Sequence, residues 1–378
     1  MNIALIRKRF NTAGLGGGAE KVAARFADEF IKRGHTVTVV SESFSGNQTE
    51  SLHHLKVGKN ILPSVCGTSA FHANAQKALK GHKFDIVYSM CRTFPVDVFR
   101  VTEQLHAEWL KVGYSRFARL NPRHRSILSL EKKALDPANT RHVVTNSELV
   151  KKQIIDIFKF PAERISVVRN GVDRDVFFPA SSEKERFCLR EKLGLSRDKI
   201  VLLFAAANFR IKGLGQAMKA CAALPAEMKK NIQLVIVGGG KQEPYQRMAE
   251  ELGISKNIVF MGKKNNMRDF YACSDLLLYP SMYEPFANVC LEACACALPV
   301  LTTRLNGSSE LVADRRNGFL LGDSSEIEKM TEAIASFASF PEKKRNEFRV
   351  AAIDAASSYS WEKHAAGLEK IFRGLLRK

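Results

Sequence analysis

Short apolar runs alternate with stretches of helical periodicity along almost the whole chain, and this alternation limits the possible folds more than any other feature. Strands that read as continuous apolar runs are typical of parallel sheets covered by helices on both faces. Repeated strand–helix–strand units of this kind build doubly wound α/β domains. The predicted strands are 1–6, 36–40, 84–88, 96–101, 142–145, 165–168, 200–205, 234–238, 258–260, 276–279 and 299–302.

The predicted strands fall into two series, which are separated by a charged, serine-rich segment at 180–190. This composition is typical of a boundary between domains. A chain of 378 residues also suits two domains of ordinary size better than one. We therefore predict two Rossmann-like domains that face each other across a cleft, one over 1–178 and the other over 179–358, followed by a last helix at 359–378.

The chain is strongly basic, with 58 Lys and Arg against 39 Asp and Glu and a formal net charge of +19. A charge of this size indicates an anionic partner: nucleic acid, an anionic membrane surface or a phosphorylated substrate. No apolar run reaches the ~18–20 residues that span a bilayer, and the run at 1–6 is too short for the core of a signal peptide. We expect a cytoplasmic protein.

The eight cysteines show no CxxC pair and no ligand-like spacing with histidine. Cys290, Cys294 and Cys296 lie close together on one expected helix. Small thiols on a buried helix in a reducing compartment are best read as part of the core. We therefore expect neither disulfides nor a metal site.

A glycine cluster, including Gly16, Gly17 and Gly18, follows the first predicted strand and precedes an amphipathic helix. Its spacing is not GxGxxG, and no acidic residue follows where a dinucleotide ribose would need one, so a dinucleotide site is disfavoured. Glycines here would let the backbone approach a ligand closely. The alternative is a tight turn without a ligand.

The stretch at 281–297 holds two glutamates, Glu284 and Glu292, that are eight residues apart. Residues 281–285 read as a loop, and Pro285 suits the first turn of the helix that follows. At a helical rise of ~1.5 Å per residue, eight residues span about 12 Å, which is roughly the separation between the sugar and the ribose of a sugar nucleotide. A diphosphate between them would face the N–H groups at the helix start. The alternative is an ordinary amphipathic helix with two solvated glutamates.

Aromatic and basic residues are interleaved over 103–133, where Trp109, Tyr114 and Phe117 alternate with arginines. An amphipathic stretch of this composition suits an anionic membrane interface. Two alternatives remain: a basic surface helix whose apolar side packs in the core, or a nucleic-acid contact. No recognised nucleic-acid module accompanies it, so we expect no nucleic-acid partner.

Taken together, these motifs resemble glycosyltransferase family 4, a group of retaining enzymes with the GT-B fold. The family motifs are the residues Gly16-Gly17-Gly18-Ala19-Glu20, Asn170-Gly171-Val172-Asp173, Lys212-Gly213, Val237-Gly238-Gly239-Gly240, Glu284-Pro285-Phe286-Ala287-Asn288-Val289-Cys290-Leu291-Glu292-Ala293 and Tyr359-Ser360-Trp361. The last motif resembles the family's late return to the first domain. Within the family, the N-terminal half is most similar to lipopolysaccharide core glucosyltransferases of type I.

The resemblance implies a donor site in the second domain. Lys212 would neutralise the diphosphate as the nucleotide leaves, and Arg210 would assist it, since the position of a family arginine holds Ala207 here. Glu284 would accept hydrogen bonds from the transferred sugar, and Glu292 from the ribose. The N–H groups of Phe286, Ala287, Asn288 and Val289 would hold phosphate, with Ala287 at a position where the family has glycine.

The resemblance places the acceptor against the first domain, whose glycine loop Gly16–Gly18 would lie near it. Glu103 and His106 follow the predicted strand at 96–101 and are candidates for orienting the acceptor. The alternative for His106 is a surface histidine without a function. The departing phosphate can take the proton, so the enzyme needs no strong base. The Asp-x-Asp sequence at 173–175 belongs to the domain-link motif, and we expect neither a metal nor a cofactor.

The resulting expectation is a retaining, metal-independent hexosyltransferase. It would transfer a hexose from a UDP-sugar to a lipopolysaccharide core or other lipid-linked acceptor, while bound peripherally to the inner face of the cell membrane. One alternative is a transferase for another glycan with a different nucleotide-sugar. Others are a nucleotide-sugar epimerase or a non-catalytic protein on the same fold that binds anionic surfaces.

Overall fold

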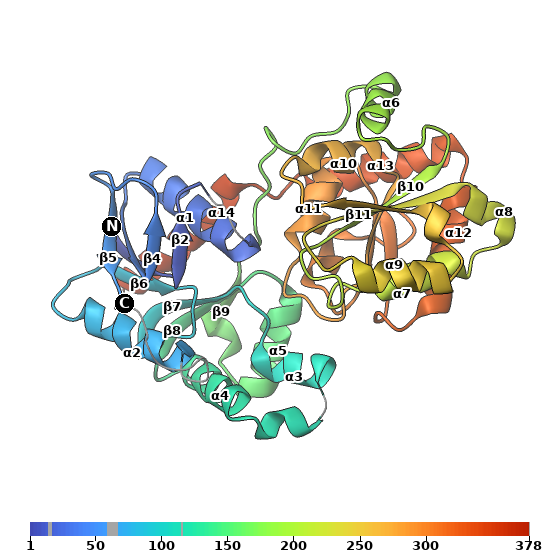
Figure 1. Ribbon diagram of the computed structural model, residues 1–378. Helices are drawn as coiled ribbons and strands as arrows, with labels where there is room; N and C mark the ends of the chain where they lie inside the picture. The colour runs from blue at the N-terminus through green and yellow to red at the C-terminus, as the bar shows by residue number, and fades with distance from the viewer. Residues whose placement is uncertain (14–16, 59–66, 115, 378) are drawn as a thin grey trace. The chain divides into compact units, whose positions relative to one another are not determined.

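The computed structural model describes residues 1–13, 17–58, 67–114 and 116–377. The chain forms two compact units, one made of Met1–Gly171 with Tyr359–Lys378 and the other of Val172–Ser358. Each unit has its own parallel sheet with helices on both faces (Figure 1). The predicted α/β class with two Rossmann-like domains is confirmed.

The first unit is built on a seven-stranded parallel sheet in the order β5-β3-β1-β6-β7-β8-β9. Helices α1 and α14 share an apolar core with one face of this sheet, and α2, α4 and α5 share one with the other. The strands are β1 (Asn2–Ile6), β2 (Arg9–Asn11), β3 (Thr36–Ser41), β4 (Ser43–Ser45), β5 (Leu52–Lys56), β6 (Ile86–Ser89), β7 (Val96–Val101), β8 (Thr140–Thr145) and β9 (Ile165–Val167). The helices are α1 (Gly18–Lys32), α2 (Gly67–Leu79), α3 (His106–Gly113), η1 (Arg116–Leu120), α4 (Pro122–Ala134), α5 (Glu148–Phe158), η2 (Ala162–Arg164) and α14 (Trp361–Leu376).

The second unit is built on a six-stranded parallel sheet in the order β12-β11-β10-β13-β14-β15. Its largest apolar cluster joins one face of the sheet to α7, α9 and α12. The strands are β10 (Ile200–Ala205), β11 (Ile232–Val237), β12 (Ile258–Gly262), β13 (Leu276–Tyr279), β14 (Val300–Thr303) and β15 (Gly318–Leu321). The helices are α6 (Glu183–Lys192), α7 (Leu214–Ala222), α8 (Ala226–Lys230), α9 (Glu243–Glu251), η3 (Ser255–Asn257), α10 (Met267–Cys273), α11 (Asn288–Ala295), η4 (Gly307–Leu311), α12 (Ile327–Ser339) and α13 (Glu342–Ala356).

Every predicted strand is present, but two strands of the large sheets, β5 and β15, were not predicted. Both lie at an edge of their sheet, where one side of the strand has no neighbour. The β5 sequence, Leu52–Lys56, holds two histidines and a lysine, and its outer positions are only partly buried. As an edge strand, β5 can carry polar residues, and it therefore lacks the apolar run that marks a central strand.

The junction between the units lies between Gly171 and Val172, earlier than the boundary that we predicted after residue 178. Two family motifs meet at this junction. A Cβ atom on Gly171 would lie 2.4 Å from the backbone nitrogen of Trp361. Only glycine allows this approach, so the link motif at 170–173 packs directly on the motif at 359–361 where the chain returns to the first unit.

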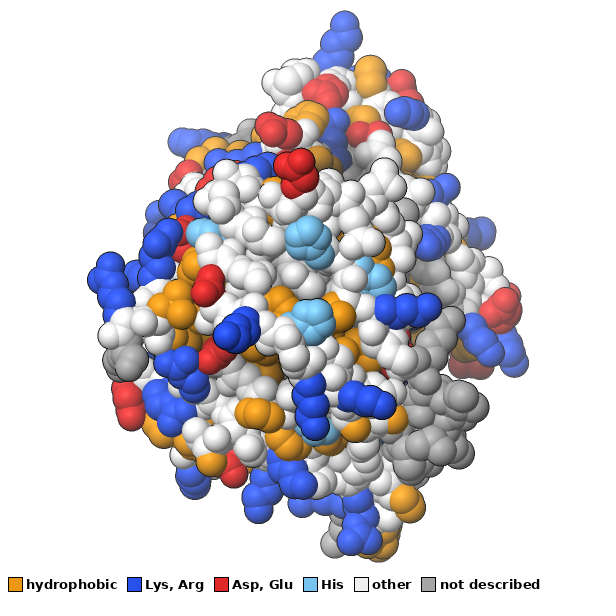
Figure 2. Space-filling model, turned by 90° about the vertical axis from the view of Figure 1, so that its left-hand side faces the viewer, with side chains coloured by type: hydrophobic (Ala, Val, Ile, Leu, Met, Phe, Trp, Pro, Cys, Tyr) orange, Lys and Arg blue, Asp and Glu red, His pale blue; other side chains and the backbone are white. Residues whose placement is uncertain are grey.

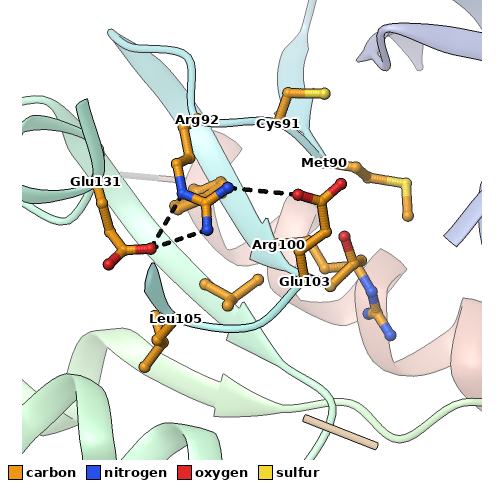
Figure 3. Close-up of a pocket in the computed structure, with 10 residues that line it drawn as sticks. Met90, Cys91, Arg92, Arg100, Glu103, Leu105 and Glu131 are labelled. Atoms are coloured by element: carbon orange, nitrogen blue, oxygen red, sulfur yellow. Dashed lines mark hydrogen bonds and ion pairs between the residues drawn. The ribbon is translucent and has the colours of Figure 1, made fainter. Parts of the chain in front are cut away.

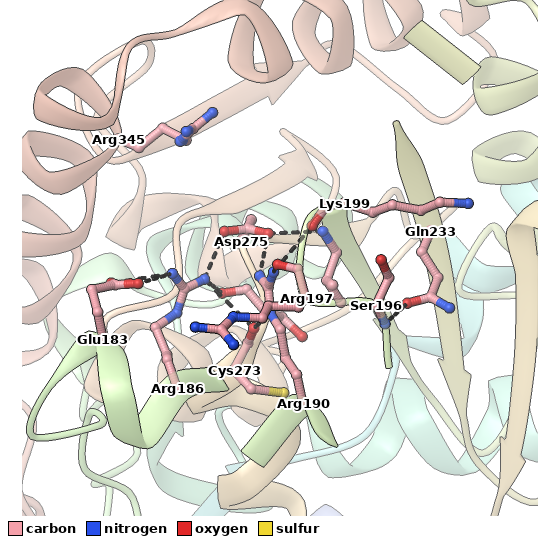
Figure 4. A network of polar contacts seen from close by, with 12 residues as sticks. Glu183, Arg186, Arg190, Ser196, Arg197, Lys199, Gln233, Cys273, Asp275 and Arg345 are labelled. Atoms are coloured by element: carbon pink, nitrogen blue, oxygen red, sulfur yellow. Dashed lines mark hydrogen bonds and ion pairs between the residues drawn. The ribbon is translucent and has the colours of Figure 1, made fainter. Parts of the chain in front are cut away.

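The prediction that segment 180–190 is a boundary between domains is wrong. Most of the segment forms α6, which is anchored in the second unit by a buried carboxylate (Figure 4). Asp275 is 3% exposed and accepts hydrogen bonds at 2.6 Å from both Arg186 and Arg190 of α6. Arg349 of α13 also contacts it, at 3.2 Å. The charges that suggested a solvated linker are therefore the anchors of a docked helix.

The three clustered cysteines are core residues, as we predicted; Cys66 lies outside the described residues. Cys290, Cys294 and Cys296 are each at most 2% exposed, and burial raises the pKa of both Cys290 and Cys296 to about 12. Over the described part of the chain, His, Cys, Asp and Glu side chains form no group of three or more that could hold a metal ion. Within the same residues, no helix is long and apolar enough to cross a membrane.

Replacing Asp275 with asparagine should strongly destabilise the second unit. Burial acts to raise the pKa of Asp275, but the three arginines outweigh it and lower that pKa to about 2. The carboxylate therefore contributes stability above its unfolded pKa near 3.8, and this contribution is lost as the pH falls toward 2. We expect Asp275→Asn to cost about 3–5 kcal/mol in the free energy of unfolding at neutral pH, measured by urea denaturation.

The matched control for this prediction is Glu183→Gln. Glu183 also pairs with Arg186, but its side chain is 52% exposed, and exposed pairs contribute about 0–1 kcal/mol. Equal losses from the two substitutions would contradict the role assigned to Asp275.

Candidate active site

The donor motif of the second unit gathers at the carboxyl ends of β10, β11, β13 and β14, the edge where ligands bind in doubly wound sheets. Gly213 allows the turn after β10 to come close to the end of β13. It has φ +84°, and a Cβ atom on it would lie 2.2 Å from the carbonyl oxygen of Pro280. The turn after β10 therefore lies directly on the end of β13 and brings Lys212 next to the loop that holds Glu284.

Lys212 and Glu284 form an ion pair between Nζ and Oε2. Their side chains are 17% and 18% exposed, so both charges are mostly shielded from water and still reachable. Lys212 Nζ also lies 5.9 Å from the centre of the Tyr279 ring. The structure thus brings together the two residues, 72 positions apart in the sequence, that we predicted to contact the diphosphate and the sugar.

Glu284 lies in a loop before α11, as we predicted for residues 281–285. Helix α11 begins at Asn288, with Ala287 as its N-cap, so the prediction that Pro285 occupies the first helical turn is wrong. Glu284 pairs with the turn after β14: its N–H donates to Leu305 O at 3.0 Å, and its carbonyl accepts from Gly307 N at 2.8 Å. The helical estimate of the separation between the two glutamates does not apply.

Glu292 lies on α11 and accepts a hydrogen bond of 2.9 Å from the hydroxyl of Tyr271. Tyr271 is 1% exposed. Burial, and then the nearby Glu292, raise the pKa of Tyr271 well above its usual value. The phenol therefore stays protonated and donates a hydrogen bond to Glu292. The sequence analysis missed Tyr271, because an aromatic residue on a core helix carries no signal of a polar role.

The remaining donor-site candidates surround the start of α11 and the turn after β10. Phe286 and Ala287 are 5% and 4% exposed, while Asn288 and Val289 are half-buried in the first turn of α11. Arg210 lines a groove of about 290 Å³ together with Gly215, Gln216, Lys219, Tyr245, Met248 and Met282. Arg210 therefore shares the turn that carries Lys212, and the groove it lines reaches Met282 in the Glu284 loop.

The Gly238–Gly240 motif has a packing role beside this site. Gly238 has φ +151°, and a Cβ atom on it would overlap the carbonyl oxygen of Ala206 at 1.7 Å. A Cβ atom on Gly240 would lie 2.7 Å from the buried ring of Phe209. The glycines let the turns after β10 and β11 pack against each other, which supports the turn that carries Lys212.

In the first unit, Gly17 caps the start of α1 and Gly18 is its first residue; Gly16 lies outside the described residues. The N–H of Gly17 donates to Glu20 at 3.1 Å, and Glu20 also pairs with Arg7 at 3.3 Å. Arg7 follows β1 and is 6% exposed. The glycine turn is therefore tied to the carboxyl end of β1, an inner strand of the sheet.

Glu103 continues this set of charges (Figure 3). It pairs with Arg7 at 3.2 Å and with Arg92 at 3.4 Å, and Arg92 in turn pairs with the buried Glu131 at 2.9 Å. Partial burial acts to raise the pKa of Glu103, but Arg92 and Arg7 outweigh it, so that pKa is lowered. The side chain is 54% exposed. A stable carboxylate of this kind suits hydrogen-bond acceptance better than proton abstraction.

His106 faces α4. Its Nε2 lies 3.0 Å from Nδ1 of His124, and its N–H donates to Glu131 at 2.8 Å. Burial, followed by the charges of Arg92, His124 and Arg123, lowers the pKa of His106 to about 4, so it is neutral at pH 7. His106 therefore connects α3 to α4 through its contacts with His124 and Glu131. It lies next to the ion pairs that Arg92 makes with Glu103 and Glu131.

The segment 106–134 divides into buried and exposed residues. Trp109 and Leu110 are 8% and 3% exposed and belong to the core, whereas Phe117 and Leu120 are 70% and 72% exposed. Exposed arginines stand close to these two residues in the sequence, at 119, 123 and 125; the side chain of Arg116 lies outside the described residues. Figure 2 shows Lys and Arg side chains spread over one face of the molecule.

Comparison with known proteins agrees with the fold and the motifs. The model "Glycosyl transferases group 1" matches residues 185–354, and "Glycosyltransferase Family 4" matches residues 16–176. The chain belongs to glycosyltransferase family 4 and has the GT-B type of fold.

Among curated relatives, the lipopolysaccharide glucosyltransferase WaaG of Escherichia coli K12 is 26% identical over 321 residues, which cover 84% of this chain and 85% of the relative. A D-inositol 3-phosphate glycosyltransferase of Catenulispora acidiphila is 29% identical over 253 residues, 64% of this chain and 57% of that relative.

Among solved structures, WaaG superposes with a TM-score of 0.85, 23% identity and 98% and 100% of the two chains covered. Anabaena HepE in complex with UDP-glucose superposes with a TM-score of 0.74 and 20% identity, with 99% and 100% covered. These likenesses establish the fold.

Replacing Gly213 with alanine should destabilise the second unit and disturb the Lys212–Glu284 pair. The natural control is Gly253→Ala: Gly253 also has a left-handed φ, +67°, but a Cβ atom added there would meet nothing within 4 Å. We expect Gly253→Ala to cost about 1 kcal/mol in the free energy of unfolding, and Gly213→Ala clearly more, because Pro280 must also move. Urea denaturation measures both, and equal costs would contradict the close-approach argument.

Proposed function

We propose that this protein is a retaining, metal-independent hexosyltransferase that uses a UDP-sugar and acts on a lipopolysaccharide core or another lipid-linked acceptor. The single observation that carries the proposal is the Lys212–Glu284 pair, which lies at the carboxyl edge of a parallel sheet beside the start of α11. The relatives support the substrate classes: WaaG is named as a lipopolysaccharide glucosyltransferase, and HepE has been solved with UDP-glucose.

In the proposed reaction, the acceptor hydroxyl attacks the anomeric carbon on the face from which UDP leaves. The bond between that carbon and the phosphate oxygen breaks, and the departing phosphate takes the hydroxyl proton. Lys212 would leave Glu284 and compensate the charge that develops on the diphosphate, with the α11 N-terminus adding its partial positive charge. Glu284 would then accept hydrogen bonds from the sugar, and Glu292 from the ribose.

On the acceptor side, we propose that Glu103 accepts a hydrogen bond from an acceptor hydroxyl. Its two arginine partners hold the carboxylate in place while half of the side chain stays exposed. His106 would help indirectly, by fixing α3 against α4.

We further propose that the protein binds the inner, anionic face of the cell membrane from the cytoplasm through the segment 103–133. Phe117 and Leu120 are exposed apolar side chains beside exposed arginines, the combination that inserts into an anionic interface. The alternative for this segment is a purely structural surface helix.

Glu284→Ala should abolish most of the donor turnover. We expect kcat/KM with the preferred UDP-sugar to fall by about 100-fold or more, because a contact to the reacting sugar is lost. UDP release from a panel of UDP-sugars measures this. Glu292→Ala should instead weaken UDP and UDP-sugar binding alike.

The control is Glu251→Gln, an exposed carboxylate on α9 in the same unit. Turnover by Glu284→Ala equal to that of the wild type would exclude the proposed role of Glu284. If the wild type neither binds nor turns over any nucleotide-sugar, the non-catalytic alternative is favoured, and product formation without an acceptor would indicate an epimerase.

Membrane binding should be salt-sensitive and local to the basic segment. Reversing the charges at Arg119, Arg123 and Arg125 should weaken binding to anionic vesicles by about tenfold or more, since each basic residue near the surface contributes about 1 kcal/mol. Vesicle co-sedimentation over a range of salt concentrations measures this.

A matched triple reversal at Arg315, Arg316 and Lys343, exposed in the second unit, changes the net charge equally. Equal loss in the two triple variants would show that net charge alone drives binding and would contradict the assignment to 103–133.

A further inference from the structure

Asn306 lies between β14 and η4 and is completely buried. Its amide makes hydrogen bonds in three directions. Oδ1 accepts from Ala287 N at 3.3 Å and from Ser308 N at 3.1 Å, and Nδ2 donates to Thr302 Oγ1 at 3.0 Å. Oδ1 thus uses both of its lone pairs, so this side chain is fully committed at its acceptor end.

The main chain on each side of Asn306 holds Glu284. Leu305 O accepts from Glu284 N, and Gly307 N donates to Glu284 O. These two hydrogen bonds form an isolated parallel bridge between Glu284 and Asn306. The position of the Glu284 backbone therefore depends on the shape of the turn that the Asn306 side chain stabilises.

Thr302 extends the same set of contacts to the end of β13. Its hydroxyl accepts from Asn306 and donates to Tyr279 O at 2.9 Å, and Thr302 is also completely buried. The end of β13, the end of β14, the Glu284 loop and the start of α11 are thus connected through one asparagine. Hydrogen bonds in such a buried network are costly to leave unmade.

We propose that Asn306 is a positioning residue of the donor site, which sets the place of Glu284 relative to the first turn of α11. This inference rests on the proposed function, in which Glu284 contacts the sugar and α11 the diphosphate. An amide carries its acceptor and its donor on separate atoms, so Oδ1 can accept from Ala287 N and Ser308 N while Nδ2 donates to Thr302 Oγ1. The N–H of Ala287 donates to Asn306 and therefore orients the turn instead of binding a ligand. The phosphate would then be bound by the N–H groups of the residues that follow Ala287.

The test compares Asn306→Ala, Asn306→Ser and Asn317→Ala. Serine is as good a cap as asparagine and can still accept from Ser308 N, but it is too short to reach Ala287 N. Asn317 is the matched control: it is 2% exposed, accepts from Ala313 N at 2.7 Å and donates to Leu311 O at 2.8 Å, so it holds a neighbouring turn in the same unit.

The measurements are kcat and KM for the preferred UDP-sugar, and the affinities for that donor and for UDP, at equal intervals below each variant's melting temperature. We expect both Asn306 variants to lose about tenfold or more in kcat/KM. Their preference for UDP-sugar over UDP should fall, because only the sugar contacts Glu284. Asn317→Ala should keep both quantities. Wild-type kcat/KM in Asn306→Ser would overturn the proposal and reduce Asn306 to a local cap.

Amide hydrogen exchange in the ligand-free protein gives a readout that does not depend on the donor. We expect faster exchange at 283–291 in both Asn306 variants, and faster exchange at 311–318 in Asn317→Ala. Unchanged exchange at 283–291 would overturn the proposal. If the wild type binds no UDP-sugar, the proposed function fails, and the exchange pattern alone decides whether Asn306 positions this loop.

Discussion

The contact between Gly213 and the carbonyl of Pro280 is the constraint on which the donor site depends. Because Gly213 lacks a side chain, the turn after β10 can lie against the end of β13, and Lys212 then reaches Glu284. Two charges that are mostly shielded from water are costly unless they are paired. The ion pair is therefore a low-energy arrangement of these two side chains. In the proposed reaction it is also reversible, because the diphosphate of the donor would replace Glu284 as the partner of Lys212.

Both units use the same physical solution to place charges beside an apolar sheet. The strands are buried on both faces, so the charged side chains of both sites lie where the strands end. Arg7 and Arg92 follow β1 and β6 in the first unit, and Lys212 and Glu284 follow β10 and β13 in the second. Helices α1, α7 and α11 begin at these same edges, so the partial positive charge at each helix N-terminus lies on the same edge as these side chains.

The sequence predicts the central strands and most donor-motif residues because these depend on local apolar runs and short motifs. It predicts poorly whatever depends on partners far along the chain. Segment 180–190 has the composition of a domain boundary, and the buried carboxylate that pairs with its arginines, Asp275, lies far away in the sequence. Glu284 lies in a loop that the sequence predicts, but its local sequence does not show that its backbone pairs with a turn centred on Asn306. Asn306 and Tyr271 carry no local signal for the same reason.

Ala287 illustrates how the structure changes the meaning of a departure from the family pattern. Its φ of −83° and ψ of 104° lie in a region that any residue adopts, so its backbone conformation does not require glycine. The residue is 4% exposed, and its methyl group occupies space next to the start of α11. A glycine at position 287 in relatives would therefore matter because it leaves more space, and not because it allows an unusual backbone conformation. Asn306, which accepts a hydrogen bond from Ala287 N, helps to fix where this methyl group lies.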